Sequence, residues 1–263
     1  KAMGIGTLGV SGVKVDSTLS PLTTLEPLEL YSLLNEASKA SVSHCVMEAS
    51  SHGLHQKRLD GCQFNAAVFS NLSHDHLDYH LNLRSYWMAK THLFKHLMDP
   101  KGVVIFHKNL PYSYEFAEIY RNRDLLAWSY GPDGDFLIKN MTLTTQGTLV
   151  EAAFFDKTIE FISPFSEMFQ IENLIAAILI VHASGKPFEA ILPHTSSITP
   201  AKGRLEKIYQ YPEGGNLYVD YAHTPNALET ILSQLKEAIE GKLWVVFGCG
   251  GQRDLNKRPL MGK

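Results

Sequence analysis

Cysteine is scarce in this chain of 263 residues. The three cysteines present, Cys45, Cys62 and Cys249, form no C-x-x-C pair. A sparse, odd count argues against a disulfide scaffold and predicts a reducing compartment. Cys45 and Cys249 lie in or beside apolar runs, so we expect both to be small buried residues.

Long hydrophobic runs and an excess of one charge are also missing. The longest apolar run, residues 174–183, is too short to span a bilayer and includes His182. The formal net charge is -3, which provides no global attraction to nucleic acid or to an anionic membrane. We therefore expect neither a nucleic acid nor a membrane as a partner.

Apolar residues make up 44% of the chain and charged residues 19%, as in a globular protein with a real core. Strand-like and helix-like segments alternate, which predicts an α/β fold with a central, mostly parallel sheet and flanking helices. Strands are expected at residues 3–10, 44–49, 66–69, 102–106, 217–220 and 243–247. Helices are expected at residues 26–40, 83–98, 114–120, 170–183 and 225–239.

Two departures from this alternation bear on domain organisation. Residues 125–162 contain strand-like pieces separated by glycine turns, which predicts a small antiparallel addition to the main sheet. Residues 196–203 are rich in Ser, Thr, Pro and Gly, which indicates a domain boundary. We place one domain at residues 1–201 and the start of a second α/β domain at residues 202–263.

The segment 71–80 (NLSHDHLDYH) concentrates three histidines and two aspartates within seven positions. It follows an apolar run, and open α/β sheets place their sites at the carboxyl ends of such strands. Imidazole and carboxylate bind divalent cations and transfer protons. The alternative is a polar turn in which Asp75 or Asp78 caps the next helix.

Glu48 and His76 are the best metal-ligand candidates. Oxygen ligands with one histidine and no clustered cysteine favour magnesium or manganese over structural zinc. Glu48 could instead be a capping or salt-bridged carboxylate, and His76 could be a satisfied core histidine.

Lys90 lies on the apolar side of its expected helix, one residue after Ala89 and four before Phe94. Its stem could simply carry the ammonium out to solvent. Alternatively, burial lowers the pKa of Lys90. A neutral amine can react with CO2 to give a carbamate, which would convert a cation into an anionic metal ligand.

Hydroxyl and basic residues provide candidate anion-binding positions. Thr23 and Thr24 precede an expected helix, where hydroxyls and free N–H groups suit a phosphate, although an ordinary cap is the simpler interpretation. Gln56 and Arg58 could reach the same anion, and Arg204 follows the interdomain linker, where it could bind a nucleotide phosphate. Solvated surface charge is the alternative for both arginines.

Taken together, the motifs of this chain resemble the Mur ligase family, and they cover nearly its whole length in order. The motifs are residues 47–58 (MEASSHGLHQKR), 68–80 (VFSNLSHDHLDYH), 203–206 (GRLE), 220–225 (DYAHTP), 248–254 (GCGGQRD) and 257–259 (KRP). The resemblance implies a phosphate-loop-type ATP-binding domain in the middle of a three-domain enzyme. It further implies that the second domain here is the start of a Rossmann-like domain that binds an amino acid.

The resemblance also implies roles for individual residues. Magnesium would be bound by Glu48, His76 and carbamylated Lys90, which are also the catalytic candidates. The UDP-muramoyl dipeptide substrate would be held by Thr23, Thr24, Ser50, Gln56 and Arg58. ATP would be surrounded by Asn173, Arg204, Asp220 and His223. His74 would be a variable neighbour, whereas Asp75, Asp78 and His80 would orient the loop.

The implied reaction is ATP-driven amide formation in peptidoglycan precursor synthesis, in the bacterial cytoplasm, by a monomer. A substrate carboxylate would take the γ-phosphoryl group to give an acyl phosphate, which the amine of a diamino acid would then attack. Two anions must approach one another, so metal ions and Arg204 would offset their repulsion. Both meso-diaminopimelate and L-lysine remain open as the added residue.

The chain departs from the family pattern at several positions. Leu25 and Leu81 stand where proline and glycine are usual, and Gln252 and Asn256 stand where Asp and Gly are more frequent. The chain contains no G-x-x-x-x-G-K-[ST] phosphate loop, and it lacks the family's Asp/Asn-Pro-Arg motif. We therefore expect an interior segment of a longer protein that does not catalyse the reaction by itself.

Three other functions fit parts of the sequence. A metal-dependent hydrolase could use His74, His76 and Asp78, but it would leave the nucleotide-type motifs unexplained. A ligase similar to folylpolyglutamate synthetase is a nearer alternative, although the SSH and DYAHTP motifs favour the Mur type. A non-catalytic binding module would not need Glu48, His76 and Lys90 together.

Overall fold

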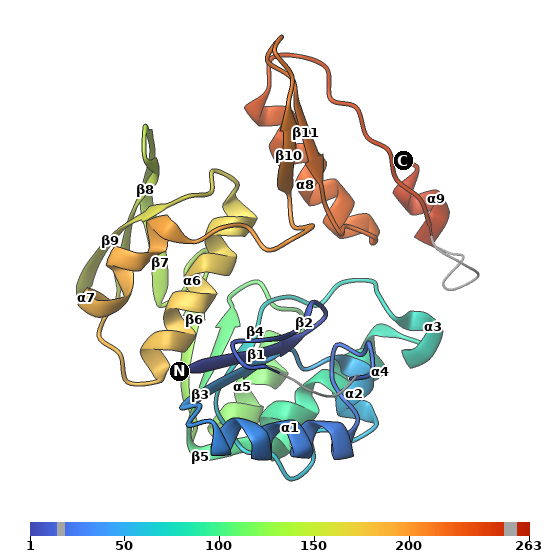
Figure 1. Cartoon of the computed structure of the whole chain (residues 1–263), viewed down its shortest axis with the longest axis vertical. Coiled ribbons are helices and arrows are strands. Elements are labelled where there is room, and N and C mark those ends of the chain that lie inside the picture. The colour runs from blue at the N-terminus through green and yellow to red at the C-terminus, as the bar shows by residue number, and fades with distance from the viewer. Residues whose placement is uncertain (15–18, 250–256) are drawn as a thin grey trace.

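The computed structural model describes residues 1–14, 19–249 and 257–263. It confirms the α/β class: helices flank a six-stranded sheet, and smaller sheets lie beside it. Figure 1 shows a main body that contains the six-stranded sheet and a separate C-terminal part above it.

The first sheet has three strands in the order β2-β1-β3. β1 (Ala2–Gly6) pairs antiparallel with β2 (Gly9–Ser11) and parallel with β3 (His44–Met47). The prediction of one strand over 3–10 is therefore wrong, since the chain turns back at Gly9, where φ is 89° and glycine adopts the left-handed region without strain. The prediction that Cys45 is buried is also wrong, because β3 is an edge strand and Cys45 is exposed.

The second sheet has the order β4-β5-β6-β7-β8-β9. β4 (Phe64–Phe69), β5 (Met98–His107) and β6 (Leu126–Tyr130) run parallel, whereas β7 (Phe136–Thr144), β8 (Gly147–Phe154) and β9 (Lys157–Ser163) pair antiparallel. The antiparallel addition expected within 125–162 is thus confirmed for β7–β9, whereas β6, in the same range, belongs to the parallel part of the sheet.

The helices α1 (Pro27–Lys39), α4 (Leu83–His92), α5 (Ser113–Arg121) and α6 (Met168–Ala183) form close to their predicted positions. The short helices α2 (Ser51–His55), α3 (Leu77–His80) and α7 (Phe188–Ile191) were not predicted. The helix expected over 83–98 continues beyond α4 only as a π-helical turn, Leu93–Leu97. Pro100 disfavours helical backbone at Asp99, and β5 has already begun by that point.

The C-terminal part contains an antiparallel hairpin, β10 (Glu206–Gln210) and β11 (Asn216–Val219), followed by α8 (Pro225–Ala238) and α9 (Lys257–Met261). Thr224 caps α8 by accepting a hydrogen bond from the Ala227 amide at 3.3 Å, as its position before Pro225 predicts. The strand expected over 243–247 does not form. No described strand pairs with this segment, and its side chains lie in solvent, with Trp244 84% and Val246 101% exposed.

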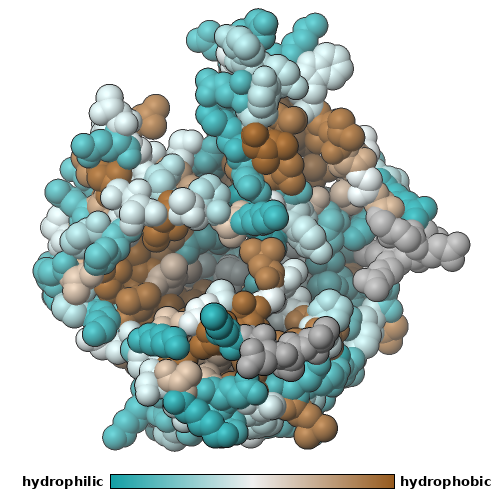
Figure 2. Space-filling view, viewed as in Figure 1, coloured by the Kyte–Doolittle hydropathy of each residue, from teal (hydrophilic) through white to brown (hydrophobic). Residues whose placement is uncertain are grey.

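Hydrophobic side chains also remain exposed on the β10–β11 hairpin, including Tyr209 and Leu217. Figure 2 shows apolar surface in this upper part of the molecule. Within the described residues, no single helix is long and apolar enough to cross a membrane. Only α6 together with residues 188–197 reaches that length and hydropathy, across a bend of 119°.

Candidate functional site

Glu48 follows β3 directly, and its carboxylate turns toward the loop between β1 and β2. The Thr7 hydroxyl donates to Glu48 Oε2 at 2.7 Å. A Cβ on Gly6 would lie only 2.5 Å from Glu48 Oε1, so the side chain occupies space that only glycine leaves free. The predicted metal ligand is therefore held by a hydroxyl and a glycine from one neighbouring turn.

The predicted substrate-binding residues lie together in one hydrogen-bonded group. Thr24 Oγ1 donates to the Glu48 carbonyl at 2.9 Å and accepts from the Ser50 amide at 2.9 Å. Arg58 donates to the Thr24 carbonyl at 2.8 Å and to Gln56 Oε1 at 2.9 Å. The group joins the loop before α1 to both ends of α2.

The Thr24 hydroxyl is wholly engaged within the protein, since the residue is only 2% exposed. The cap interpretation of Thr23 and Thr24 is wrong, because α1 begins at Pro27 and its N-cap is Glu26, which makes no side-chain cap. Ser50 instead caps α2, and its hydroxyl accepts from the Gly53 amide at 3.1 Å. Thr24 thus fixes the position of backbone that flanks the predicted site.

The histidine-rich segment folds around the short helix α3. His76 before the helix and Leu81 after it both take left-handed backbone, with φ of 53° and 68°. His80 is 4% exposed, shares a 2.9 Å hydrogen bond with Ser51 Oγ and stacks on Tyr86 with ring centroids 5.2 Å apart. Burial lowers the pKa of His80 to about 4, so its ring is neutral near pH 7.

Asp75 lies between imidazoles from the two parts of the molecule. Its Oδ2 is 3.4 Å from His76 Nε2 and 3.4 Å from His223 Nε2. Burial opposes ionisation of Asp75, but the hydrogen bond with His223, the charges of His76 and His223 and the His76 amide together hold the Asp75 pKa below its usual value. The same hydrogen bond raises the pKa of His223. The Asp75 carboxylate therefore links the histidine-rich segment 71–80 to the DYAHTP motif at residues 220–225.

Lys90 projects from α4 toward the same group of side chains. Its Nζ lies 5.2 Å from the centroid of the Tyr86 ring, and the His76 ring lies 5.9 Å from that ring. Burial lowers the pKa of Lys90, and the charge of Asp75 opposes the shift only partly. Of the two alternatives for Lys90, burial favours the lowered pKa over an ammonium carried out to solvent, and a lowered pKa increases the fraction of neutral amine.

Two of the predicted ATP-binding residues, Arg204 and Asp220, lie together at the interdomain linker, whereas His223 contacts Asp75. Arg204 stacks over the Tyr221 ring at 4.8 Å. The Asp220 carboxylate accepts from the Leu205 and Ala222 amides, both at 2.6 Å. Gln170 of α6 donates to the Arg204 carbonyl at 3.2 Å. Asn173 lies three residues further along α6, on the same helix face.

The donor chemistry fits magnesium better than a protein-caged metal. Among the residues that the structure describes, no three His, Cys, Asp or Glu side chains gather to hold a metal ion. His74, His76 and Asp78 therefore do not form the three-ligand centre of a metallohydrolase. Magnesium usually keeps several waters and binds one or two carboxylates plus substrate phosphates. Glu48 and His76 carry donors of that kind, and their role as metal ligands, like that of a carbamylated Lys90, stays a prediction.

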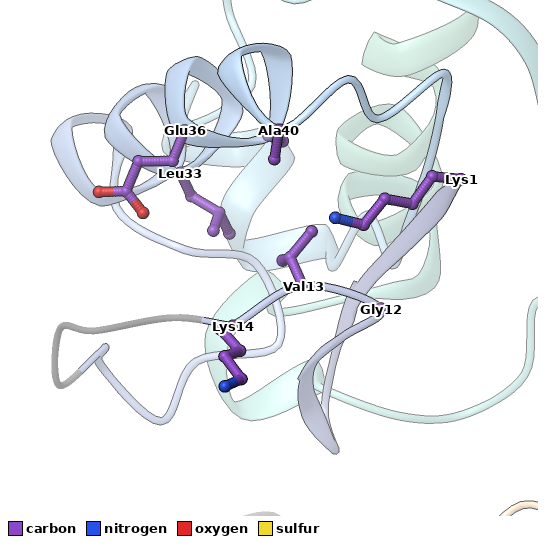
Figure 3. A pocket seen from close by; sticks show the side chains of 8 residues that line it. Lys1, Gly12, Val13, Lys14, Leu33, Glu36 and Ala40 are labelled. Carbon is purple, nitrogen blue, oxygen red and sulfur yellow. The ribbon is translucent and has the colours of Figure 1, made fainter.

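The structure also contains a cavity of about 590 Å³ in the main body (Figure 3). It lies between α1 and the start of the chain, where Lys1, Lys14 and Glu36 line it together with Val13 and Leu33. None of the predicted site residues lines this cavity. The site is therefore defined by the side-chain contacts around Glu48, Asp75 and Lys90.

Three residues at the site escaped prediction: Thr7, Ser51 and Tyr86. Thr7 follows a strand, as Glu48 does, so a search for polar residues at strand ends could have found it. Tyr86 carries no comparable signal, because a tyrosine on the apolar side of a helix is typical of a core residue. The proposed motif residues Arg253 and Asp254 lie outside the described part of the chain.

The family profile for the Mur ligase middle domain matches residues 1–181, and the profile for the Mur ligase glutamate ligase domain matches residues 203–263. The UDP-N-acetylmuramoyl-L-alanyl-D-glutamate--2,6-diaminopimelate ligase of Rickettsia montanensis is 36% identical over 269 residues, which cover 100% of this chain and 55% of that protein. The relative of the same name from Agrobacterium fabrum is 36% identical over 263 residues, which cover 100% of this chain and 54% of that protein.

Solved structures give a consistent result. A structure of UDP-N-acetylmuramoyl-L-alanyl-D-glutamate--2,6-diaminopimelate ligase is similar with a TM-score of 0.75 and 33% identity, covering 99% of this chain and 53% of that chain. Mycobacterium tuberculosis folylpolyglutamate synthase has a TM-score of 0.63 at 17% identity, covering 78% of this chain and 46% of that chain. At that identity the second likeness concerns the fold alone.

The chain spans about half the length of the curated relatives that it matches. The two profile matches leave residues 182–202 unassigned, and the predicted boundary between residues 201 and 202 stays a prediction. Both matched domains are Mur ligase domains, and whole-chain identity to two relatives exceeds one third. The chain belongs to the Mur ligase family.

Proposed function

We propose that the protein containing this chain is an ATP-dependent amide ligase. Its reaction joins 2,6-diaminopimelate to UDP-N-acetylmuramoyl-L-alanyl-D-glutamate in peptidoglycan precursor synthesis. The observation that carries the proposal is 36% identity across the whole chain to relatives with that printed activity. We propose a cytoplasmic location, where ATP and UDP-linked substrates are made, and we keep the monomeric state as a prediction.

The proposed roles follow from where each group lies. Ser50, Gln56 and Arg58 are joined through Thr24, so we assign this face and Thr23 to the UDP-muramoyl dipeptide. Asn173, Arg204, Asp220 and His223 are assigned to ATP. The guanidinium of Arg204 would offset repulsion between the substrate carboxylate and the triphosphate.

Glu48, His76 and Lys90 are assigned to magnesium, which would neutralise the charge that develops on the phosphates. We propose that Lys90 acts as its carbamate. The neutral Lys90 amine attacks the carbon of CO2, a C–N bond forms and one proton leaves to solvent. Burial lowers the pKa of Lys90, which favours the amine form that this step requires.

A phosphate-release assay on the full-length protein tests the proposal. The assay contains ATP, magnesium and UDP-N-acetylmuramoyl-L-alanyl-D-glutamate, with meso-diaminopimelate or L-lysine as the acceptor. We expect release with meso-diaminopimelate and much less with L-lysine. Release with L-lysine alone would overturn the assignment of the acceptor, and no release with either would overturn the ligase assignment.

A further inference from the structure

A hydrogen-bonded chain connects three separate segments beside the proposed site. Glu48 after β3, Thr7 between β1 and β2, and Thr23 before α1 contribute one side chain each. The Thr7 hydroxyl is 2.7 Å from Glu48 Oε2 and 3.0 Å from Thr23 Oγ1. Thr7 is therefore the shared partner of a proposed metal ligand and a proposed substrate-binding residue.

The chemistry of the three groups fixes the direction of this chain. An ionised carboxylate can only accept hydrogen bonds, so the single Thr7 proton is directed at Glu48. The Thr7 oxygen must then accept the Thr23 proton. The Thr23 hydroxyl consequently has its proton turned inward, and its free lone pairs can accept a hydrogen bond from a ligand.

The turn that carries Thr7 is shaped to receive the Glu48 carboxylate. A Cβ on Gly6 would lie 2.5 Å from Glu48 Oε1 and 2.8 Å from Cδ. A Cβ at position 6 would therefore force the Glu48 carboxylate to shift from its place beside Thr7. Gly6 and Thr7 together therefore determine where the carboxylate of Glu48 lies.

We propose that Thr7 is a positioning residue that couples cation binding at Glu48 to dipeptide binding at Thr23. The inference rests on the proposed function. Carboxylates that bind metals are held by hydrogen-bond partners, whose loss weakens metal binding. Because binding free energies are reciprocal, a cation that favours the ordered chain favours the dipeptide, and the dipeptide favours the cation by the same factor.

Two binding measurements on the full-length protein test the coupling. Mn²⁺ affinity is measured by electron paramagnetic resonance, and affinity for UDP-N-acetylmuramoyl-L-alanyl-D-glutamate is measured by calorimetry with and without Mn²⁺. For Thr7→Val we expect Mn²⁺ affinity about tenfold weaker than in the wild type. We also expect Mn²⁺ to lose most of its effect on dipeptide affinity.

Matched variants separate positioning from folding. Thr7→Ser keeps the hydroxyl and should retain the wild-type affinities, whereas Gly6→Ala should weaken Mn²⁺ binding as Thr7→Val does. Leu8→Ala, at an exposed neighbour in the same turn, should change neither affinity. Wild-type affinity and wild-type coupling in Thr7→Val would overturn the role of Thr7 while leaving the ligase proposal intact. A wild-type protein that binds neither Mn²⁺ nor UDP-N-acetylmuramoyl-L-alanyl-D-glutamate would overturn both the role of Thr7 and the ligase proposal.

Discussion

Lys90 is an ionisable side chain whose burial favours its uncharged form. Its Nζ faces the Tyr86 ring, and burial lowers its pKa. We predict that Lys90→Ala lowers ligase turnover by roughly a hundredfold or more, since the proposed carbamate oxygens would be lost from the metal site. Bicarbonate should not restore turnover, whereas acetate should restore part of it by supplying a carboxylate. The measurement is phosphate release under saturating substrate.

Lys95 provides the matched control, because it lies in the following π-helical turn and contacts Met88 rather than Tyr86. Lys95→Ala should keep wild-type turnover. Full activity of Lys90→Ala would contradict the assigned role.

The lowered pKa of His80 makes the free energy of unfolding depend on pH. The pKa of this buried imidazole falls to about 4 in the folded protein from an ordinary value of 6.5. Between those values the unfolded chain binds a proton that the folded protein does not, so the free energy of unfolding falls as pH drops. Urea denaturation should show lower stability at pH 4.5 than at pH 7.

The variant His80→Gln should lose less stability over the same pH interval, because glutamine does not titrate and can still reach Ser51. The comparison uses the difference between the two pH values, so an overall loss of packing in the variant does not affect it. An identical pH dependence in the two proteins would refute the assignment to His80.

At the scale of the element, Leu81 is placed in backbone that suits glycine. It follows α3 with φ of 68°, and its side chain is 81% exposed. Left-handed backbone costs a residue with a Cβ about 1–2 kcal/mol, and the greater chain entropy of glycine offsets part of that gain. Leu81→Gly should therefore raise the free energy of unfolding by up to about 1 kcal/mol.

Thermal or urea unfolding of the purified variant measures this change directly. Leu81→Ala provides the control, since alanine keeps the Cβ and should keep the strain. Equal destabilisation by both substitutions would show that the Leu81 side chain contributes packing that its exposure does not indicate.

The elements also show how far the sequence could predict this fold. The helices α1, whose apolar residues recur near helical spacing, and α6, a long apolar segment, formed where expected, because both signals are encoded locally. The predicted strand at 243–247 failed, since an apolar run becomes a strand only when another strand receives its hydrogen bonds. The β1–β2 turn was missed because Gly9 lies within an otherwise continuous strand-like run.

The site was predictable to a similar degree. Polar residues after apolar runs identified Glu48, His76 and Asp220, whose positions depend on strand ends. The partners of these residues could not be predicted, because they come from distant segments: Thr7 for Glu48 and Tyr86 for Lys90. The residue types indicated what each side chain could bind, whereas contacts between distant segments decided which neighbours surround it.

At the scale of the whole molecule, the two parts meet at groups that carry the proposed chemistry. Asp75 contacts His223 across the interface, and Gln170 contacts the linker at Arg204. A ligase must bring a carboxylate and a triphosphate together, and under the proposed function these contacts between segment 71–80 and the 220–225 motif would place both substrates at one interface. The C-terminal part also has exposed apolar side chains, including Tyr209, Leu217 and Trp244 (Figure 2).

We propose that the protein containing this chain activates a carboxylate as an acyl phosphate. The most direct test uses the full-length protein with UDP-N-acetylmuramoyl-L-alanyl-D-glutamate labelled with ¹⁸O in the reacting carboxylate. Attack of that carboxylate on ATP, followed by displacement by the amine of diaminopimelate, transfers one labelled oxygen to each phosphate released. Mass spectrometry of the phosphate should therefore show one ¹⁸O atom for each amide bond formed. Amide formation with unlabelled phosphate would contradict the account.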